Sequence, residues 1–139
     1  MATRVDPSQD DRRTPRQRSG DAAEGAVAAA LCDQGWVILA RQVRLGRDEL
    51  DIVALEPGPP AVLVVVEVRS RRTSAFGSQE ERLDEAKVRR LYRAMNALRA
   101  GGRLPQGNVF PSAVGWRVDL IAVDHVAGHL RHLKGLIPR

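Results

Sequence analysis

The segment "VLVVVEVRSRR", residues 62–72, predicts the central strand of the fold. Its first five residues are apolar and β-favouring, which is typical of a strand buried on both faces. Glu67 follows this run directly, and an arginine cluster begins at Arg69. Because a buried carboxylate is costly without a partner, three arrangements are open. Glu67 reaches solvent at the sheet edge, pairs with Arg69 on its own face, or shares a divalent cation with a second carboxylate.

The preceding segment supplies that second carboxylate. "DELDIVALE", residues 48–56, alternates as a strand does, and "EPGPP" is typical of a turn. We therefore expect an antiparallel hairpin of about 48–56 with 61–69. Asp51 and Glu67 then lie on neighbouring strands, where they repel each other unless one is protonated or a cation lies between them. The alternation places Glu49, Asp51 and Val53 on one face of the first strand, and Leu50, Ile52 and Ala54 on the other.

Paired carboxylates suit a hard divalent cation. Mg²⁺ and Mn²⁺ bind through one or two carboxylates, completed by water and by substrate phosphates. A cation held in this way polarises a phosphate oxygen and lowers the pKa of its bound water. The hairpin therefore indicates phosphodiester hydrolysis as a candidate chemistry.

Two helices are expected around the hairpin. "DAAEGAVAAALCDQG" predicts a helix over 21–34, with Asp21 and Glu24 in the spacing of a capping box and Cys32 in the core. A second helix is expected over about 80–100, ended by two glycines. On its helical wheel Lys87 falls within the apolar arc, so this cation should face inward.

Three further strands complete the expected fold. "WVILARQVR" is rich in β-favouring residues, "WRVDLIAVD" forms another strand, and "HLRHLKGL" is a weak final strand. The order αβββαβ predicts an α/β (α+β) protein with a mixed central sheet flanked by helices. Residues 1–20 are expected to be a disordered basic arm, because they carry almost no apolar side chains, and 21–139 a single domain.

Composition narrows the class of protein. The chain has 139 residues, a net charge of +5 and one cysteine, which favours a reducing compartment over a disulfide scaffold. Residues 69–103 hold ten Lys/Arg against four Asp/Glu, so the positive excess is concentrated there. This concentration suits a polyanionic partner. No apolar run is long enough for a membrane span or a signal peptide, so we expect a cytoplasmic protein.

Several of these segments together resemble a known family. "GDAAEGAVAAALCDQGWVILARQVR", "DELDIVA", "VVVEVRSRR", "EAKVRRL" and "WRVDLIAV", within about residues 20–124, are similar to successive blocks of the YraN-like family of uncharacterised bacterial proteins. The resemblance implies the restriction-endonuclease-like fold and a relationship to archaeal Holliday junction resolvases. It also implies a nucleic-acid substrate and a homodimer, since those resolvases are two-fold dimers.

The resemblance also implies roles for individual residues. Asp51 and Glu67 become ligands of Mg²⁺ or Mn²⁺, with the Val68 carbonyl as a third ligand. Glu24 matches a family glutamate that reaches the metal site, and Lys87 a family lysine on the second long helix. The remaining predicted site residues carry positive charge toward the nucleic acid: Arg69, Arg71, Arg72 and Arg90.

One residue departs from the superfamily pattern. Arg69 stands where a lysine is usual, and an arginine cannot act as a base because its pKa exceeds about 12. Arg69 can still hold a water or the scissile phosphate. Three functions are therefore considered: a metal-dependent endonuclease acting on DNA, including branched or structured DNA; a non-catalytic nucleic-acid-binding module on the same fold; and an accessory protein-interaction module.

Overall fold

The computed structural model describes residues 12–71, 83–111, 113 and 115–139. Two helices and five strands follow one another along this part of the chain. They are α1 (Pro15–Asp33), β1 (Val37–Leu45), β2 (Asp48–Glu56), β3 (Val62–Arg71), α2 (Glu85–Gly101), β4 (Gly115–Asp124) and β5 (His129–Leu133). The predicted order αβββαβ is confirmed, and the weakly predicted final strand is β5.

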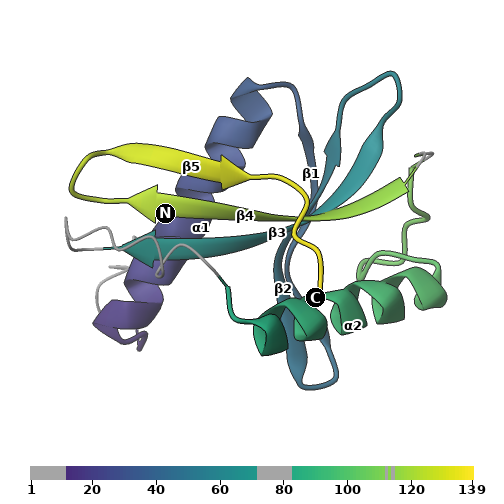
Figure 1. The fold of residues 1–139 in the computed structure, drawn as a ribbon, viewed down its shortest axis with the longest axis horizontal. Coiled ribbons are helices and arrows are strands. Elements are labelled where there is room, and N and C mark those ends of the chain that lie inside the picture. Colours follow the sequence, from purple (N-terminus) through teal and green to yellow (C-terminus); the bar gives the residue numbers. More distant parts are fainter. Residues whose placement is uncertain (1–11, 72–82, 112, 114) are drawn as a thin grey trace, which may run out of the picture.

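The five strands form one mixed sheet in the order β1-β2-β3-β4-β5. β1, β2 and β3 pair antiparallel, β3 and β4 pair parallel, and β5 is antiparallel to β4. The parallel pair is joined through α2, as a parallel connection requires. Figure 1 shows α1 passing behind the sheet while α2 crosses its other side. This α+β arrangement is consistent with the restriction-endonuclease-like fold.

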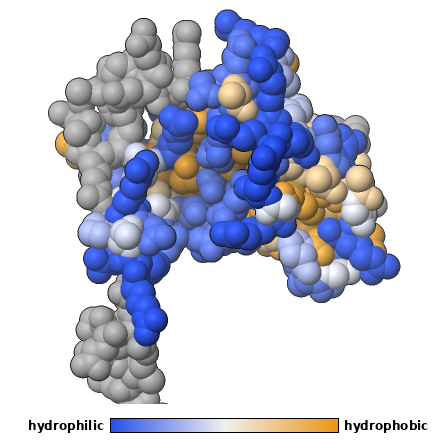
Figure 2. Space-filling model, turned by 90° about the horizontal axis from the view of Figure 1, so that it is seen from below, coloured by the Kyte–Doolittle hydropathy of each residue, from blue (hydrophilic) through white to orange (hydrophobic). Residues whose placement is uncertain are grey.

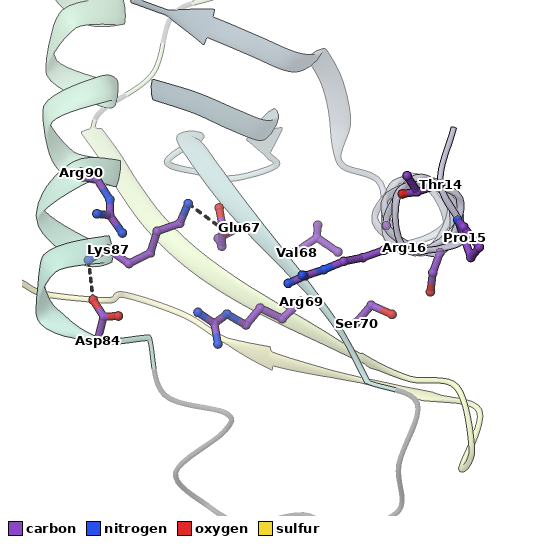
Figure 3. A pocket seen from close by; sticks show the side chains of 12 residues that line it. Thr14, Pro15, Arg16, Glu67, Val68, Arg69, Ser70, Asp84, Lys87 and Arg90 are labelled. Carbon is purple, nitrogen blue, oxygen red and sulfur yellow. Dashed lines mark hydrogen bonds and ion pairs between the residues drawn. The ribbon is translucent and has the colours of Figure 1, made fainter. Parts of the chain in front are cut away.

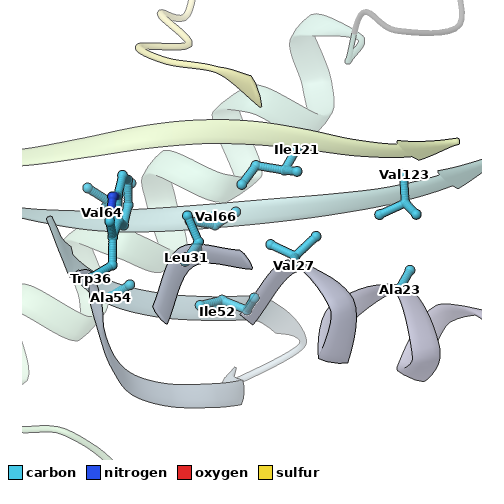
Figure 4. Packing of buried hydrophobic residues seen from close by; sticks show 10 residues of the cluster. All are labelled: Ala23, Val27, Leu31, Trp36, Ile52, Ala54, Val64, Val66, Ile121 and Val123. Atoms are coloured by element: carbon cyan, nitrogen blue, oxygen red, sulfur yellow. The ribbon is translucent and has the colours of Figure 1, made fainter. Parts of the chain in front are cut away.

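The central strand β3 is buried on both faces, as its sequence predicts. Val64 and Val66 pack with Val27 and Leu31 of α1 (Figure 4), whereas Val65 packs with α2 on the opposite face. All three β3 valines are 0% exposed. Burying such a side chain stabilises the fold by roughly 1.5–3 kcal/mol. Cys32 was expected in this core but is exposed, so that prediction is wrong.

Helix α1 begins earlier than the sequence analysis placed it. Thr14 is the N-cap: its Oγ1 accepts the Gln17 N–H at 3.1 Å, and Gln17 Oε1 accepts the Thr14 N–H at 2.8 Å. This reciprocal pair satisfies the capping role that was assigned to Asp21 and Glu24. Residues 15–20 are therefore helical rather than part of a disordered arm, and residues 1–11 lie outside the described part of the chain.

The predicted alternation along β2 fails at one residue. Ile52 and Ala54 pack on the α1 face as expected, but Leu50 packs on the α2 face. On the neighbouring strand β1, Gln42 has a left-handed φ of 52° between the pairs Arg41↔Ile52 and Val43↔Leu50. The regular pleat of the β1–β2 pair is therefore interrupted beside Leu50.

Helix α2 is fixed at both ends. The Asp84 carboxylate accepts the Lys87 N–H at 2.8 Å, and Gly102 ends the helix in the left-handed conformation with φ 73°. The predicted glycine stop is confirmed, while residues 80–82 of the predicted helix lie outside the described residues. Neither described helix is long and apolar enough to cross a membrane.

A buried polar network ties the C-terminal segment to β4. Asp119 is 0% exposed and accepts two hydrogen bonds from the Arg117 guanidinium, at 2.7 and 2.8 Å. It also bonds His132 at 2.8 Å and accepts the Gly135 N–H at 3.0 Å. Because every interaction favours the ionised carboxylate, the pKa of Asp119 is lowered to about 2 despite burial. Asp119 thus has a structural role, and its hydrogen-bond partners do not include the hairpin carboxylates.

Candidate functional site

The strands β2 and β3 separate where the two predicted carboxylates stand. Their residue-by-residue pairing ends at Ile52↔Val66, and the next residues are Asp51 and Glu67. Beyond this point the Val68 N–H donates to Asp51 Oδ2 at 2.9 Å instead of to a backbone carbonyl of β2. The opened strand ends therefore hold both carboxylates side by side, and a backbone hydrogen bond fixes Asp51.

Glu67 is compensated only in part. It is 8% exposed, its Oε1 lies 3.5 Å from Lys87 Nζ, and its Oε2 is buried with no hydrogen-bond partner among the described residues. Burial, followed by the negative charge of Asp51, raises the pKa of Glu67 to about 7. Of the arrangements that the sequence left open, neither solvent nor an ion pair with Arg69 supplies the partner. The compensating cation comes from α2.

The pKa of Asp51 is also subject to opposing influences. Burial raises its pKa above the ordinary value, whereas the Val68 N–H and the charge of Lys87 lower it. Two ionised carboxylates that lie this close together repel each other. A divalent cation between them removes this repulsion, so the donor set fits Mg²⁺ or Mn²⁺.

Glu24 approaches the pair from the opposite face of the sheet. It is 7% exposed on α1, and its Oε1 lies 3.9 Å from Arg41 Nη2 without accepting a hydrogen bond from any described residue. Burial and the charge of Asp51 raise the pKa of Glu24 to about 7. Within the described ranges no three His, Cys, Asp or Glu side chains converge as a metal-ligand group. Glu24 is thus a neighbour of Asp51, and its role as a ligand stays a prediction.

Only some of the predicted basic residues are described beside Glu67. Lys87, Arg69 and Arg90 line the same cavity as Glu67, and Figure 3 shows Arg69 pointing from β3 toward α2. Of Arg71 only the backbone is described, as the last residue of β3, and Arg72 lies outside the described residues. The inward direction of Lys87, predicted from the helical wheel, is confirmed by its contact with Glu67.

The sequence analysis missed three residues near this site. Arg16 lines the cavity beside Glu67 from the first turn of α1, Arg41 faces Glu24, and Gln42 donates a hydrogen bond to Asp21 at 3.2 Å. The T-x-x-Q capping signal could have placed Arg16 on the helix. No local signal marks Gln42, since glutamine rarely adopts positive φ.

Comparison with known proteins places the chain in a family. The model of the uncharacterised protein family UPF0102 matches residues 23–123, which include every hairpin and helix residue predicted for the site. The chain belongs to the UPF0102 family.

Relatives in distant bacteria cover most of the chain. A UPF0102 protein of Roseiflexus castenholzii is 38% identical over 78% of this chain and 81% of its own. A UPF0102 protein of Bacteroides thetaiotaomicron is 36% identical over 83% of this chain and 88% of its own. A UPF0102 protein of Halorhodospira halophila is 38% identical over 87% of this chain and 86% of its own. The resemblance predicted from the sequence is therefore confirmed at the level of the family, whose description names no activity.

Proposed function

We propose that this UPF0102 protein is a divalent-metal-dependent nuclease-like protein that hydrolyses phosphodiester bonds in DNA, including branched or structured DNA. The observation that carries the proposal is the pair of Asp51 and Glu67 at the opened ends of β2 and β3. The pair is buried, burial raises the pKa of both members, the charge of Asp51 raises that of Glu67 further, and one lysine offsets these effects only in part. Such groups are concentrated at functional sites.

The residues that would hold the cation are Asp51, Glu67 and the Val68 carbonyl. Because no third His, Cys, Asp or Glu joins them as a ligand group within the described residues, water and a substrate phosphate would complete the shell, as is usual for Mg²⁺. A bound cation supplies charge to a phosphate oxygen and acidifies its water. Glu24, whose pKa the charge of Asp51 raises, would bind a water of the same shell.

The basic residues have separate roles in this proposal. Lys87, 3.5 Å from Glu67, keeps an ammonium group beside the carboxylates and orients the attacking water or the phosphate. Arg69 remains protonated, so it holds the phosphate and does not accept a proton. Arg90 lines the same cavity and adds positive charge along the substrate.

One observation favours a second candidate, a non-catalytic nucleic-acid-binding module. The Lys87 ammonium already lies against Glu67, and in such a module it would take the place of the cation. This protein would bind DNA with a steep salt dependence and no turnover. Arg69→Lys restores the usual superfamily residue, so cleavage gained by this variant would indicate a site altered away from catalysis.

The deciding experiment measures cleavage of labelled duplex, flap, single-stranded and four-way-junction DNA with Mg²⁺ or Mn²⁺. The variants are Asp51→Asn and Glu67→Gln, with Glu49→Gln as the matched control. Glu49 lies on the same strand but its side chain is 42% exposed and faces Arg44. Titration calorimetry with Mn²⁺ gives a second readout that does not depend on turnover.

The proposal predicts that both site variants lose cleavage and Mn²⁺ binding, while the control keeps both. Cleavage that survives in Glu67→Gln would refute the assignment of the site. Equal DNA binding by all proteins, without cleavage in any metal, would favour the binding module. If the protein binds no DNA under any condition, the accessory protein-interaction module becomes the favoured function. That function predicts an acidic protein partner that duplex DNA does not displace.

A further inference from the structure

We propose that a nucleic-acid strand crosses the Asp51–Glu67 pair through two adjoining cavities. Arg16 on α1 anchors its phosphates on one side of the pair, and Arg47 in the β1–β2 turn anchors them on the other. The inference rests on the nucleic-acid substrate of the proposed function but not on metal chemistry. It assigns a role to the first turn of α1 and to the β1–β2 turn, neither of which belongs to the hairpin pattern.

The larger cavity lies between three chain segments. The first turns of α1 and α2 and the end of β3 enclose a volume of about 960 Å³. Figure 3 shows Arg16 extending from α1 toward the middle of this space and Lys87 reaching Glu67 from α2. The unpartnered Oε2 atom belongs to Glu67, which lines the cavity. The cavity thus leads directly to the carboxylate pair.

The charges of the larger cavity favour an anion. Arg16, Arg69 and Arg90 line it, and none of them forms an ion pair with a carboxylate in the part of the chain that the structure describes. Of the two acids of its wall, Asp84 caps α2, and Glu67 is compensated in part by Lys87 of the same cavity. Three guanidinium groups that form no ion pair with a described carboxylate suit consecutive phosphates, which they can bind through two hydrogen bonds each.

The smaller cavity opens on the other side of the pair. It has a volume of about 360 Å³, is lined by Asp51 and Arg47, and shares Lys87 and Arg90 with the larger cavity. Two further acids line this cavity, and each has a basic partner: Asp48 accepts two hydrogen bonds from Arg93 at 2.8 and 2.9 Å, and Glu49 forms an ion pair with Arg44 at 3.6 Å. Arg47 has no ion pair with a described carboxylate. Positive charge therefore continues past the pair.

The arrangement has a consequence for the substrate. A site with one opening suits a chain end, whereas openings on both sides suit an internal phosphate with strand on either side. The surface on the α2 side is mainly hydrophilic, with hydrophobic residues gathered toward the right of the view in Figure 2. Electrostatic contact with phosphates, without base readout, is the binding mode that such a surface supports. The site should thus accept a strand that has no free end.

Binding without metal tests this inference. A labelled DNA oligonucleotide in EDTA is titrated with the whole protein and with Arg16→Ala and Arg47→Ala, across a range of salt concentrations. Each control also removes one charge: Arg18→Ala lies on α1, as Arg16 does, and Arg89→Ala lies on α2, where Arg89 pairs with Glu85 at 3.2 Å. Neither control residue lines a cavity described above. A circular single strand of the same sequence is titrated beside the linear one.

Each cavity variant should lose about fivefold in affinity at about 0.1 M salt, because one lost phosphate contact lowers the salt slope by about 0.7 for a single strand. The controls should stay within about twofold, and the circular strand should bind as tightly as the linear one. Unchanged binding by Arg16→Ala or Arg47→Ala would overturn the inference. Tight binding that requires a free strand end would also overturn it.

Failure of the proposed chemistry gives a different result. If the wild type never cleaves but Arg16→Ala and Arg47→Ala bind more weakly than the controls, the strand path stands and the nuclease assignment falls. If the wild type cleaves but these variants bind normally, the assignment stands and the path is wrong.

Discussion

Replacing Glu67 with glutamine should stabilise the protein at about pH 8 in the absence of divalent cations. Glu67 is 8% exposed, and one of its carboxylate oxygens lacks a hydrogen-bond partner within the described chain. Burial and the neighbouring Asp51 oppose its ionised form. Glutamine keeps the shape of the side chain and removes the charge, so the folded state no longer holds a poorly compensated carboxylate.

The expected gain follows from the pKa of Glu67. Its rise from 4.5 to about 7 corresponds to about 3 kcal/mol of free energy between the two protonation states. The contact with Lys87 is already included in this value, because the ammonium group lowers the pKa of Glu67. The free energy of unfolding of Glu67→Gln should therefore exceed that of the wild type by about 3 kcal/mol above neutral pH.

The gain should depend on pH in a defined direction. Between 4.5 and about 7 the folded state retains the Glu67 proton that the unfolded chain releases. The wild type therefore loses stability as pH rises through this window, whereas the variant does not. The difference should be near zero at and below about pH 4.5, grow through the window, and reach a plateau above about pH 8.

Urea denaturation followed by the fluorescence of Trp36 and Trp116 measures this difference from about pH 5 to about pH 8 in EDTA. Glu49→Gln is the control, since its side chain is 42% exposed and should change stability by less than about 0.5 kcal/mol. A Glu67→Gln protein less stable than the wild type at about pH 8 would refute the reasoning. A gain of equal size at every pH would also refute it, because a packing effect has no such pH dependence.

Three further changes test other parts of the structure. Asp119→Asn should lower the free energy of unfolding by about 2 kcal/mol in urea denaturation, since it removes the ionised carboxylate that Arg117 contacts and leaves Arg117 paired with Glu56. Because the pKa of Asp119 is lowered from 3.8 to about 2, this difference should shrink as pH falls through that window. Thr14→Ala should cost about 1 kcal/mol and increase amide exchange in the turn that carries Arg16. Leu91→Ala, which empties a 2% exposed position between α2 and the sheet, should cost about 3 kcal/mol in the same denaturation experiment.

The sequence predicted the elements that depend on local periodicity. The continuous apolar run of β3 identified a strand buried on both faces, and the helical wheel turned Lys87 inward. The hairpin followed from two β-favouring segments around a proline-rich turn, and it placed Asp51 beside Glu67. These signals are readable because the side-chain periods of strands and helices are fixed by backbone geometry.

Local signals also misled where two of them competed. The D-x-x-E pattern at Asp21 was read as the start of α1, but Thr14 and Gln17 form the cap one and a half to two turns earlier. The D-x-x-E pattern lies next to the apolar part of the helix, whereas the observed helix begins in the polar segment before it. The packing of Leu50 on the α2 face had no local signal, since strict alternation along β2 groups it with Ile52 and Ala54.

By itself the sequence determined the order of the elements, the buried central strand and the residues that form the acidic pair. Only the tertiary structure decided which cation meets Glu67, because the contact with Lys87 depends on how α2 packs across the sheet. It likewise brought Arg16 to the cavity beside Glu67 from a segment read as disordered. Such contacts join residues far apart in the chain, and their geometry is set by the packing of helices on the sheet, which no local pattern encodes.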